Sequence, residues 1–241
     1  MNVKYQKYMA DNHLGIKKMR KNLKLTDEKT GTTILTGSVN DLEKILYFLK
    51  LDALEKKKWI DKVNRAMTTG KNKNKGYKKT PESQISIPQK LKAEGVEIDI
   101  PIAKGGAKVA PDFSVLGEYM FLTNGKLGRK GYKDLYNAGI TDAQIDEFIK
   151  VIKKFKGEIR ANVTGVRNAD FTNCWIEMGL NPTLANKIYE HIDLTWHHLD
   201  DLGPDLKSGF QLVIERVHKA TIVHMGSNKK IKKLLEIIQL N

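Results

Sequence analysis

The feature that most constrains the fold of this 241-residue chain is the recurrence of apolar side chains every three to four residues. Leu42, Ile45, Leu46 and Leu49 follow this spacing and predict an amphipathic helix over about 40–50. A Thr-x-x-Gln capping box at Thr141 opens a second such segment. Further helices are predicted over about 54–67, 113–122, 182–192, 205–225 and 228–238. We therefore expect a mainly α fold.

Sequence that favours β-structure is limited to two short segments. Residues 32–36 form a β-prone patch between two glycines. Residues 96–102 alternate apolar and polar side chains and include Pro101, which is typical of an edge strand. The sequence thus predicts at most a small β element.

Composition along the chain suggests three parts. Glycines and prolines at 105–111 are suited to a hinge between two halves. The first residues are rich in lysine and only weakly periodic. We expect an N-terminal arm at 1–37, an N-terminal helical lobe with a basic loop at 38–110, and a C-terminal helical lobe at 111–241.

Positive charge is concentrated in the first part of the chain. The net charge is +14, and residues 1–92 hold 22 lysines and arginines against 9 aspartates and glutamates. Residues 93–241 hold 20 and 19. Such concentration points to a polyanion, either nucleic acid or an anionic membrane surface. A solvated lysine-rich surface is the alternative reading.

Several classes of protein are excluded by cysteine content and hydropathy. Cys174 is the only cysteine, so an intramolecular disulfide and a cysteine-based zinc finger are excluded. Its neighbour Trp175 favours a buried, inert thiol. No apolar run approaches the roughly 20 residues that span a bilayer, and the first residues lack the apolar stretch of a secretory signal. A reduced, cytosolic setting is expected.

Three groups of basic residues are candidates for contacts with phosphate. They are the lysine-rich loop 71–79 with the helix before it, a glycine-containing loop at 124–131, and two arginines in 160–167. Tyr77 offers a face on which a base can stack. A plain surface loop, a plain turn and ordinary helix pairing are the alternatives. The candidate RNA-binding residues are Lys62, Arg65, Lys71, Lys73, Lys75, Tyr77, Lys78, Lys79, Lys126, Arg129, Lys130, Arg160 and Arg167.

A cluster of histidines and carboxylates is the one candidate for metal binding or acid–base chemistry. It comprises Glu190, His191, His197, His198, Asp200 and Asp201. Its spacing matches no named metal signature, so capping and interface roles are the favoured interpretation. No nucleophile motif or kinase-like set occurs, and no catalytic residue, metal or cofactor is predicted.

Residues 41–80 resemble the corresponding stretch of bunyavirus nucleoproteins of the phlebovirus and tenuivirus type. The shared features are an amphipathic helix (here DLEKILYFLK), a charged helix that ends in an apolar-Thr-x-Gly turn at 66–70, and a Lys/Arg-rich run. The resemblance implies a two-lobed helical nucleoprotein-like fold. It also implies sequence-independent coating of single-stranded RNA in a cleft between the lobes, and docking of the N-terminal arm on a neighbouring subunit.

The leading prediction is therefore a viral-type nucleocapsid protein that binds single-stranded RNA and itself. It is expected to be no enzyme, to bind no membrane, and to reside in the virion and the host cytoplasm. A coat protein of a flexible filamentous RNA virus is one alternative. A metal-dependent nuclease, or another phosphate-handling enzyme that uses the histidine cluster, is a second, and a membrane-surface adaptor is a third.

Overall fold

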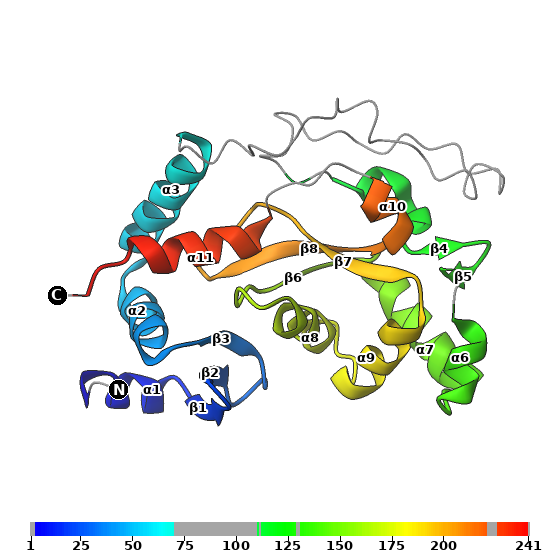
Figure 1. Ribbon diagram of the computed structural model, residues 1–241, viewed down its shortest axis with the longest axis horizontal. Coiled ribbons are helices and arrows are strands. Elements are labelled where there is room, and N and C mark those ends of the chain that lie inside the picture. The colour runs from blue at the N-terminus through cyan, green and yellow to red at the C-terminus, as the bar shows by residue number, and fades with distance from the viewer. Residues whose placement is uncertain (1–2, 70–109, 111, 129–130, 221–225, 241) are drawn as a thin grey trace.

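The computed structural model describes residues 3–69, 110, 112–128, 131–220 and 226–240. Over these residues the chain is a mixed α/β protein with three antiparallel sheets (Figure 1). The prediction of a mainly α fold with at most a small β element is therefore wrong. None of the described helices is long and apolar enough to cross a membrane.

The first described residues form a small sheet where the sequence suggested an arm. A short 3-10 turn, η1 (Val3–Tyr5), and helix α1 (Gln6–Asp11) lead into β1 (Leu14–Met19), β2 (Asn22–Asp27) and β3 (Thr33–Gly37). The strands pair in the order β1-β2-β3. Leu25 and Leu35 pair across the sheet and are fully buried, so this segment belongs to the folded body. The β-prone patch at 32–36 is confirmed by β3.

Two helices follow this sheet as predicted. α2 (Val39–Lys50) begins with a capping box between Ser38 and Asp41, and it buries Leu42, Ile45 and Leu46. α3 is Ala53–Thr69. The predicted strand at 96–102 and the lysine-rich loop 71–79 lie outside the described residues. The boundaries proposed at 37/38 and 110/111 stay predictions.

The middle of the chain is a series of short elements and one long helix. The elements are η3 (Ser114–Met120), the hairpin of β4 (Leu122–Thr123) and β5 (Lys126–Leu127), α6 (Tyr132–Asn137) and α7 (Asp142–Lys154). The segment 113–122, predicted as an α-helix, is mainly 3-10. The capping box of Thr141 and Gln144 is confirmed at the start of α7.

The C-terminal part is built around a three-stranded sheet in the order β6-β8-β7. Its strands are β6 (Glu158–Asn162), β7 (Leu194–His198) and β8 (Lys207–Ile214). The helices are α8 (Arg167–Glu177), α9 (Pro182–His191), α10 (Glu215–Ala220) and α11 (Ser227–Ile237). α8 packs against β6, α10 packs against β7 and β8, and η3 packs against β8.

The helix predicted over 205–225 is wrong for a physical reason. β8 is the central strand of its sheet, and seven of its eight residues are buried. A strand that is covered on both faces shows a continuous apolar run without alternation, and periodicity alone cannot separate such a run from a buried helix. Only Glu215–Ala220 of the predicted segment is a described α-helix.

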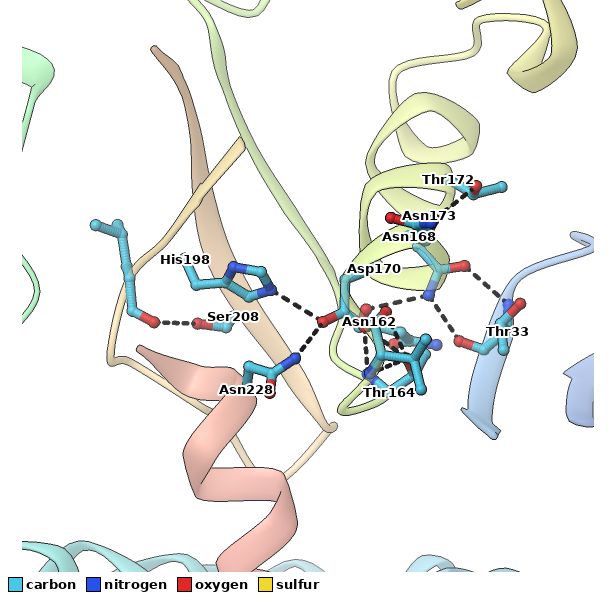
Figure 2. Close-up of polar contacts among 12 residues, drawn as sticks. Thr33, Asn162, Thr164, Asn168, Asp170, Thr172, Asn173, His198, Ser208 and Asn228 are labelled. Carbon is cyan, nitrogen blue, oxygen red and sulfur yellow. Dashed lines mark hydrogen bonds and ion pairs between the residues drawn. The ribbon is translucent and has the colours of Figure 1, made fainter. Parts of the chain in front are cut away.

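A buried asparagine joins the N-terminal sheet to the C-terminal part. Asn173 on α8 accepts a hydrogen bond from the backbone N–H of Thr33 at 2.9 Å and donates to the carbonyl oxygen of Thr33 at 2.7 Å (Figure 2). It also donates to the carbonyl oxygen of Asn162 at 3.1 Å. Its side chain thus pairs with β3 as a neighbouring strand would.

We predict that Asn173→Leu destabilises the protein by about 2–5 kcal/mol. Two buried backbone groups of Thr33 lose their partners, and each unsatisfied group costs about 1–3 kcal/mol. Urea unfolding checks this value. Asn168→Leu is the matched control on the exposed face of the same helix, where a change within about 0.5 kcal/mol is expected. Equal losses in the free energy of unfolding for the two variants would show that the hydrogen bonds of Asn173 do not stabilise the fold.

Candidate functional site: a histidine cavity at the edge of a sheet

The candidate site is a cavity of about 680 Å³ beside β7. Four consecutive residues of this strand, Thr195 to His198, belong to its wall. The remaining lining residues come from the start of α8, from α10 and from the start of α11, and they are Gly165, Arg167, Glu215, His218, Lys219, Gly226, Asn228, Lys229 and Lys232.

The position of β7 at the edge of its sheet explains why both of its faces reach the cavity. Successive side chains of a strand point to opposite faces. Trp196 and His198 face α8, where Trp175 and Phe171 contact them, whereas His197 faces Phe113 and α10. A single cavity can include both faces only by passing the outer edge of the strand.

His197 and His218 meet on the α10 side of the strand. Nδ1 of His197 lies 3.2 Å from Nε2 of His218, and Phe113 packs edge-on against His197. Metal–nitrogen bonds of about 2.0–2.1 Å at a tetrahedral angle place two ligating nitrogens about 3.3 Å apart. The two imidazoles share a hydrogen bond, and the distance of this bond is also close to the separation of two ligating nitrogens. Within the described residues, no group of three or more His, Cys, Asp or Glu side chains could hold a metal ion.

His198 makes a hydrogen bond to a buried carboxylate on the α8 side. Its Nε2 lies 2.9 Å from Oδ2 of Asp170, and the Asp170 side chain is fully buried (Figure 2). Since a carboxylate only accepts, this contact places the hydrogen on Nε2 and leaves the lone pair on Nδ1. No hydrogen-bond partner for Nδ1 occurs among the described residues. The arrangement leaves this nitrogen able to accept a proton.

Gly226 fixes the start of α11 against this histidine. A Cβ atom at Gly226 would lie 2.7 Å from the carbonyl oxygen of His198 and 2.8 Å from its Cβ. Only glycine allows such a close approach. The first turn of α11 is therefore held beside the cavity.

Three cations at the cavity have no carboxylate partner in the part of the chain that the structure describes: Arg167, Lys229 and Lys232. The Arg167 guanidinium lies 5.0 Å from the centre of the Phe171 ring and donates to Oγ1 of Thr195 at 2.7 Å. A further cation, Lys219, is paired with Glu215 at 2.7 Å. The wall therefore carries an excess of positive charge, which favours an anionic ligand.

The structure brings together part of the predicted histidine cluster. His197 and His198 line the cavity, whereas His191, Asp200 and Asp201 do not. Burial acts to raise the pKa of Asp201, but hydrogen bonds from Ser208 and Gly209 and the nearby Arg160 hold this pKa below its usual value. Asp201 therefore organises the loop between β7 and β8.

The predicted RNA-binding residues lie in different places. Lys62 packs over the Trp59 ring at 4.8 Å on α3, the helix that also carries Arg65, and Lys126 packs over Tyr132 at 5.8 Å. Arg160 forms an ion pair with Asp201 at 2.6 Å. Of the predicted set, Arg167 is the described residue that lines the cavity. The other candidates lie outside the described residues: Lys71, Lys73, Lys75, Tyr77, Lys78, Lys79, Arg129 and Lys130.

Sequence reasoning missed three residues of the site: Asp170, His218 and Asn228. His218 and Asn228 lie on segments predicted to be helical, whereas Asp170 lies outside every predicted helix, and no local motif marks any of the three as a site residue. All three bond to an imidazole or a carboxylate that is distant in sequence. Such contacts cannot be recognised before the fold is known. The prediction that Cys174 is buried is confirmed, and burial raises the pKa of its thiol well above the usual range.

Comparison with known proteins does not assign this site. Neither protein-family models, nor curated proteins, nor solved structures give a match to the chain. The site must therefore be interpreted from its own geometry.

Proposed function

We propose that this chain is a metal-dependent nuclease that hydrolyses phosphodiester bonds at the histidine cavity. The observation that carries the proposal is that one cavity is lined by His198, which is bonded to Asp170, and by the His197–His218 pair on the other face of β7, together with cations that have no carboxylate partner among the described residues. The prediction of a nucleocapsid protein, with single-stranded RNA and itself as partners and without enzymatic activity, remains untested. The cavity geometry favours the alternative reading.

Phosphodiester hydrolysis needs a general base, neutralisation of the developing charge and binding of the anionic substrate. A base must take the proton of the attacking water, and the developing negative charge must be neutralised. A divalent metal supplies Lewis acidity and orients the phosphate. The substrate must also be held by cations that match its charge.

Each residue then has a defined role. Nδ1 of His198 accepts the proton of the water, because Nε2 is engaged by Asp170. His197 and His218 would hold the divalent ion through the two nitrogens that lie 3.2 Å apart.

The cations serve binding in this proposal. Arg167 and the lysines of α11 hold phosphates beside the histidines. Arginine is suited to this because its guanidinium presents a rigid fork of donors. The basic residues Lys62 and Arg65 on α3 remain candidates for contacts with the rest of the polymer.

We predict that His198→Gln lowers the rate of cleavage by about 10²–10⁴-fold, the usual contribution of a general base. The measurement is cleavage of labelled single-stranded RNA, single-stranded DNA and duplex DNA by the full chain with divalent metal. His191→Gln, outside the cavity, is the matched control and should cleave at the wild-type rate. Tight binding of single-stranded RNA with no cleavage of any substrate would instead favour the nucleocapsid prediction.

Metal removal gives an independent prediction. Treatment with EDTA should abolish cleavage, and titration with Mg²⁺, Mn²⁺, Ni²⁺ or Zn²⁺ should restore it. His197→Asn and His218→Asn should each raise the metal concentration for half-maximal activity by more than about 10–100-fold, the loss caused by outer-shell substitutions. Full activity in EDTA would contradict a role for a metal.

Charge removal on α11 tests the binding role. We expect Lys229→Gln with Lys232→Gln to raise KM more than it lowers kcat, and to reduce the salt dependence of binding to single strands by about 0.7 log units per log salt for each lost phosphate contact. Lys187→Gln, an exposed lysine of α9 outside the cavity, is the control. An unchanged salt slope in the double variant would place the phosphates elsewhere.

A further inference from the structure

A buried carboxylate without a buried cation beside it is costly unless hydrogen bonds satisfy it, and Asp170 is such a group. Its side chain is fully buried in the first turn of α8. Four hydrogen bonds reach its two oxygens. The way in which they are divided between the oxygens indicates what the residue does.

One oxygen serves the local fold. Oδ1 of Asp170 accepts from the backbone N–H of Thr164 at 2.6 Å and from the hydroxyl of Thr164 at 2.7 Å. These bonds tie the first half of α8 to the loop that follows β6. If Asp170 had a purely structural role, these two bonds to Oδ1 would be sufficient for it.

The other oxygen faces the site. Oδ2 lies 2.9 Å from Nε2 of His198 and accepts from Nδ2 of Asn228 at 3.2 Å (Figure 2). Asn228 belongs to the first turn of α11 and lines the cavity. One carboxylate oxygen thus connects the histidine of β7 with the helix that carries the cavity lysines.

The ring of His198 has little freedom apart from this bond. It packs against Phe210 with centroids 4.6 Å apart and against Phe171 at 5.8 Å. Only 13% of its side chain is exposed. With the ring plane held by aromatic contacts and Nε2 held by Asp170, the free lone pair lies on Nδ1.

We infer that Asp170 is the positioning residue that fixes His198 as the Nε2–H tautomer and so leaves the lone pair of its neutral ring on Nδ1. This inference rests on the proposed function for its catalytic consequence, but its structural part does not. A carboxylate that holds an imidazole in one tautomer and orientation is known from other acid–base sites. Here the same oxygen also positions the first turn of α11 through Asn228.

The isosteric change Asp170→Asn separates this role from a structural one. The amide oxygen can still accept from Thr164. Its NH₂ group then faces His198 and donates to Nε2, which forces the opposite, Nδ1–H tautomer. The free lone pair is thereby moved away from the position where the proposal needs it.

The first measurement is ¹⁵N NMR of histidine-labelled full chain at alkaline pH, with the His198 signals assigned by comparison with His198→Gln. The wild-type protein should show His198 as the Nε2–H tautomer, and Asp170→Asn should show it as Nδ1–H. A wild-type His198 in the Nδ1–H form would overturn the inference. This measurement needs no activity, and the wild-type result does not depend on the fold of Asp170→Asn.

The second measurement is the cleavage rate of the same proteins. Asp170→Asn should lower kcat by about 10²–10⁴-fold with little change in KM. Thr164→Val removes the hydroxyl bond to Oδ1 and the hydroxyl contacts with the backbone of Val166, but leaves Oδ2 and its bond to His198 in place, so it is the control and should lower the melting temperature while kcat stays within a few-fold. A kcat for Asp170→Asn equal to that of Thr164→Val would overturn the positioning role, whereas absence of cleavage by the wild-type chain would overturn the proposed function and leave the tautomer result standing.

Discussion

The rest of the structure depends on the satisfaction of two buried polar side chains on α8. Asp170 and Asn173 are both fully buried and lie on adjacent turns of the helix. An unsatisfied buried polar group costs about 1–3 kcal/mol, and a charged one more, so their partners are fixed by necessity. Those partners come from β3, the loop after β6, β7 and α11. Segments far apart in the sequence therefore meet at one helix.

This convergence has a consequence for the cavity. The N-terminal sheet is bonded to α8 through Thr33 and Asn173, and Lys44 of α2 donates to the carbonyl oxygen of Leu235 in α11 at 2.6 Å. α11 also packs against α3. Helices α8 and α11, which border the His198 side of the cavity, thus both contact the N-terminal part of the chain. The first 69 residues act on the site by holding its walls, although none of them lines it.

The sequence predicted the helices well where local signals were strong. Ser38, Thr141 and Asn181 each cap the helix that the spacing indicated, because capping acts within one turn. The strands were largely missed: β1 and β2 lie in a leader that was read as weakly periodic and lysine-rich, and β8 is buried on both faces. For the site, His197 and His198 were recognisable as neighbours in sequence. The partner of His198, Asp170, lies 28 residues away in the sequence, and the partner of His197, His218, lies 21 residues away, so only tertiary structure brings them close.

The edge position of β7 links the charge of the cavity to the stability of the fold. Within the described residues, β7 has no strand on its outer side, and an open edge invites pairing with another chain. Natural proteins discourage such pairing with charged side chains, lysine above all. Arg167, Lys229 and Lys232 line the cavity that borders this edge, so they place such charge beside it. The cations to which we assign ligand binding would therefore also discourage pairing of β7 with a strand of another chain.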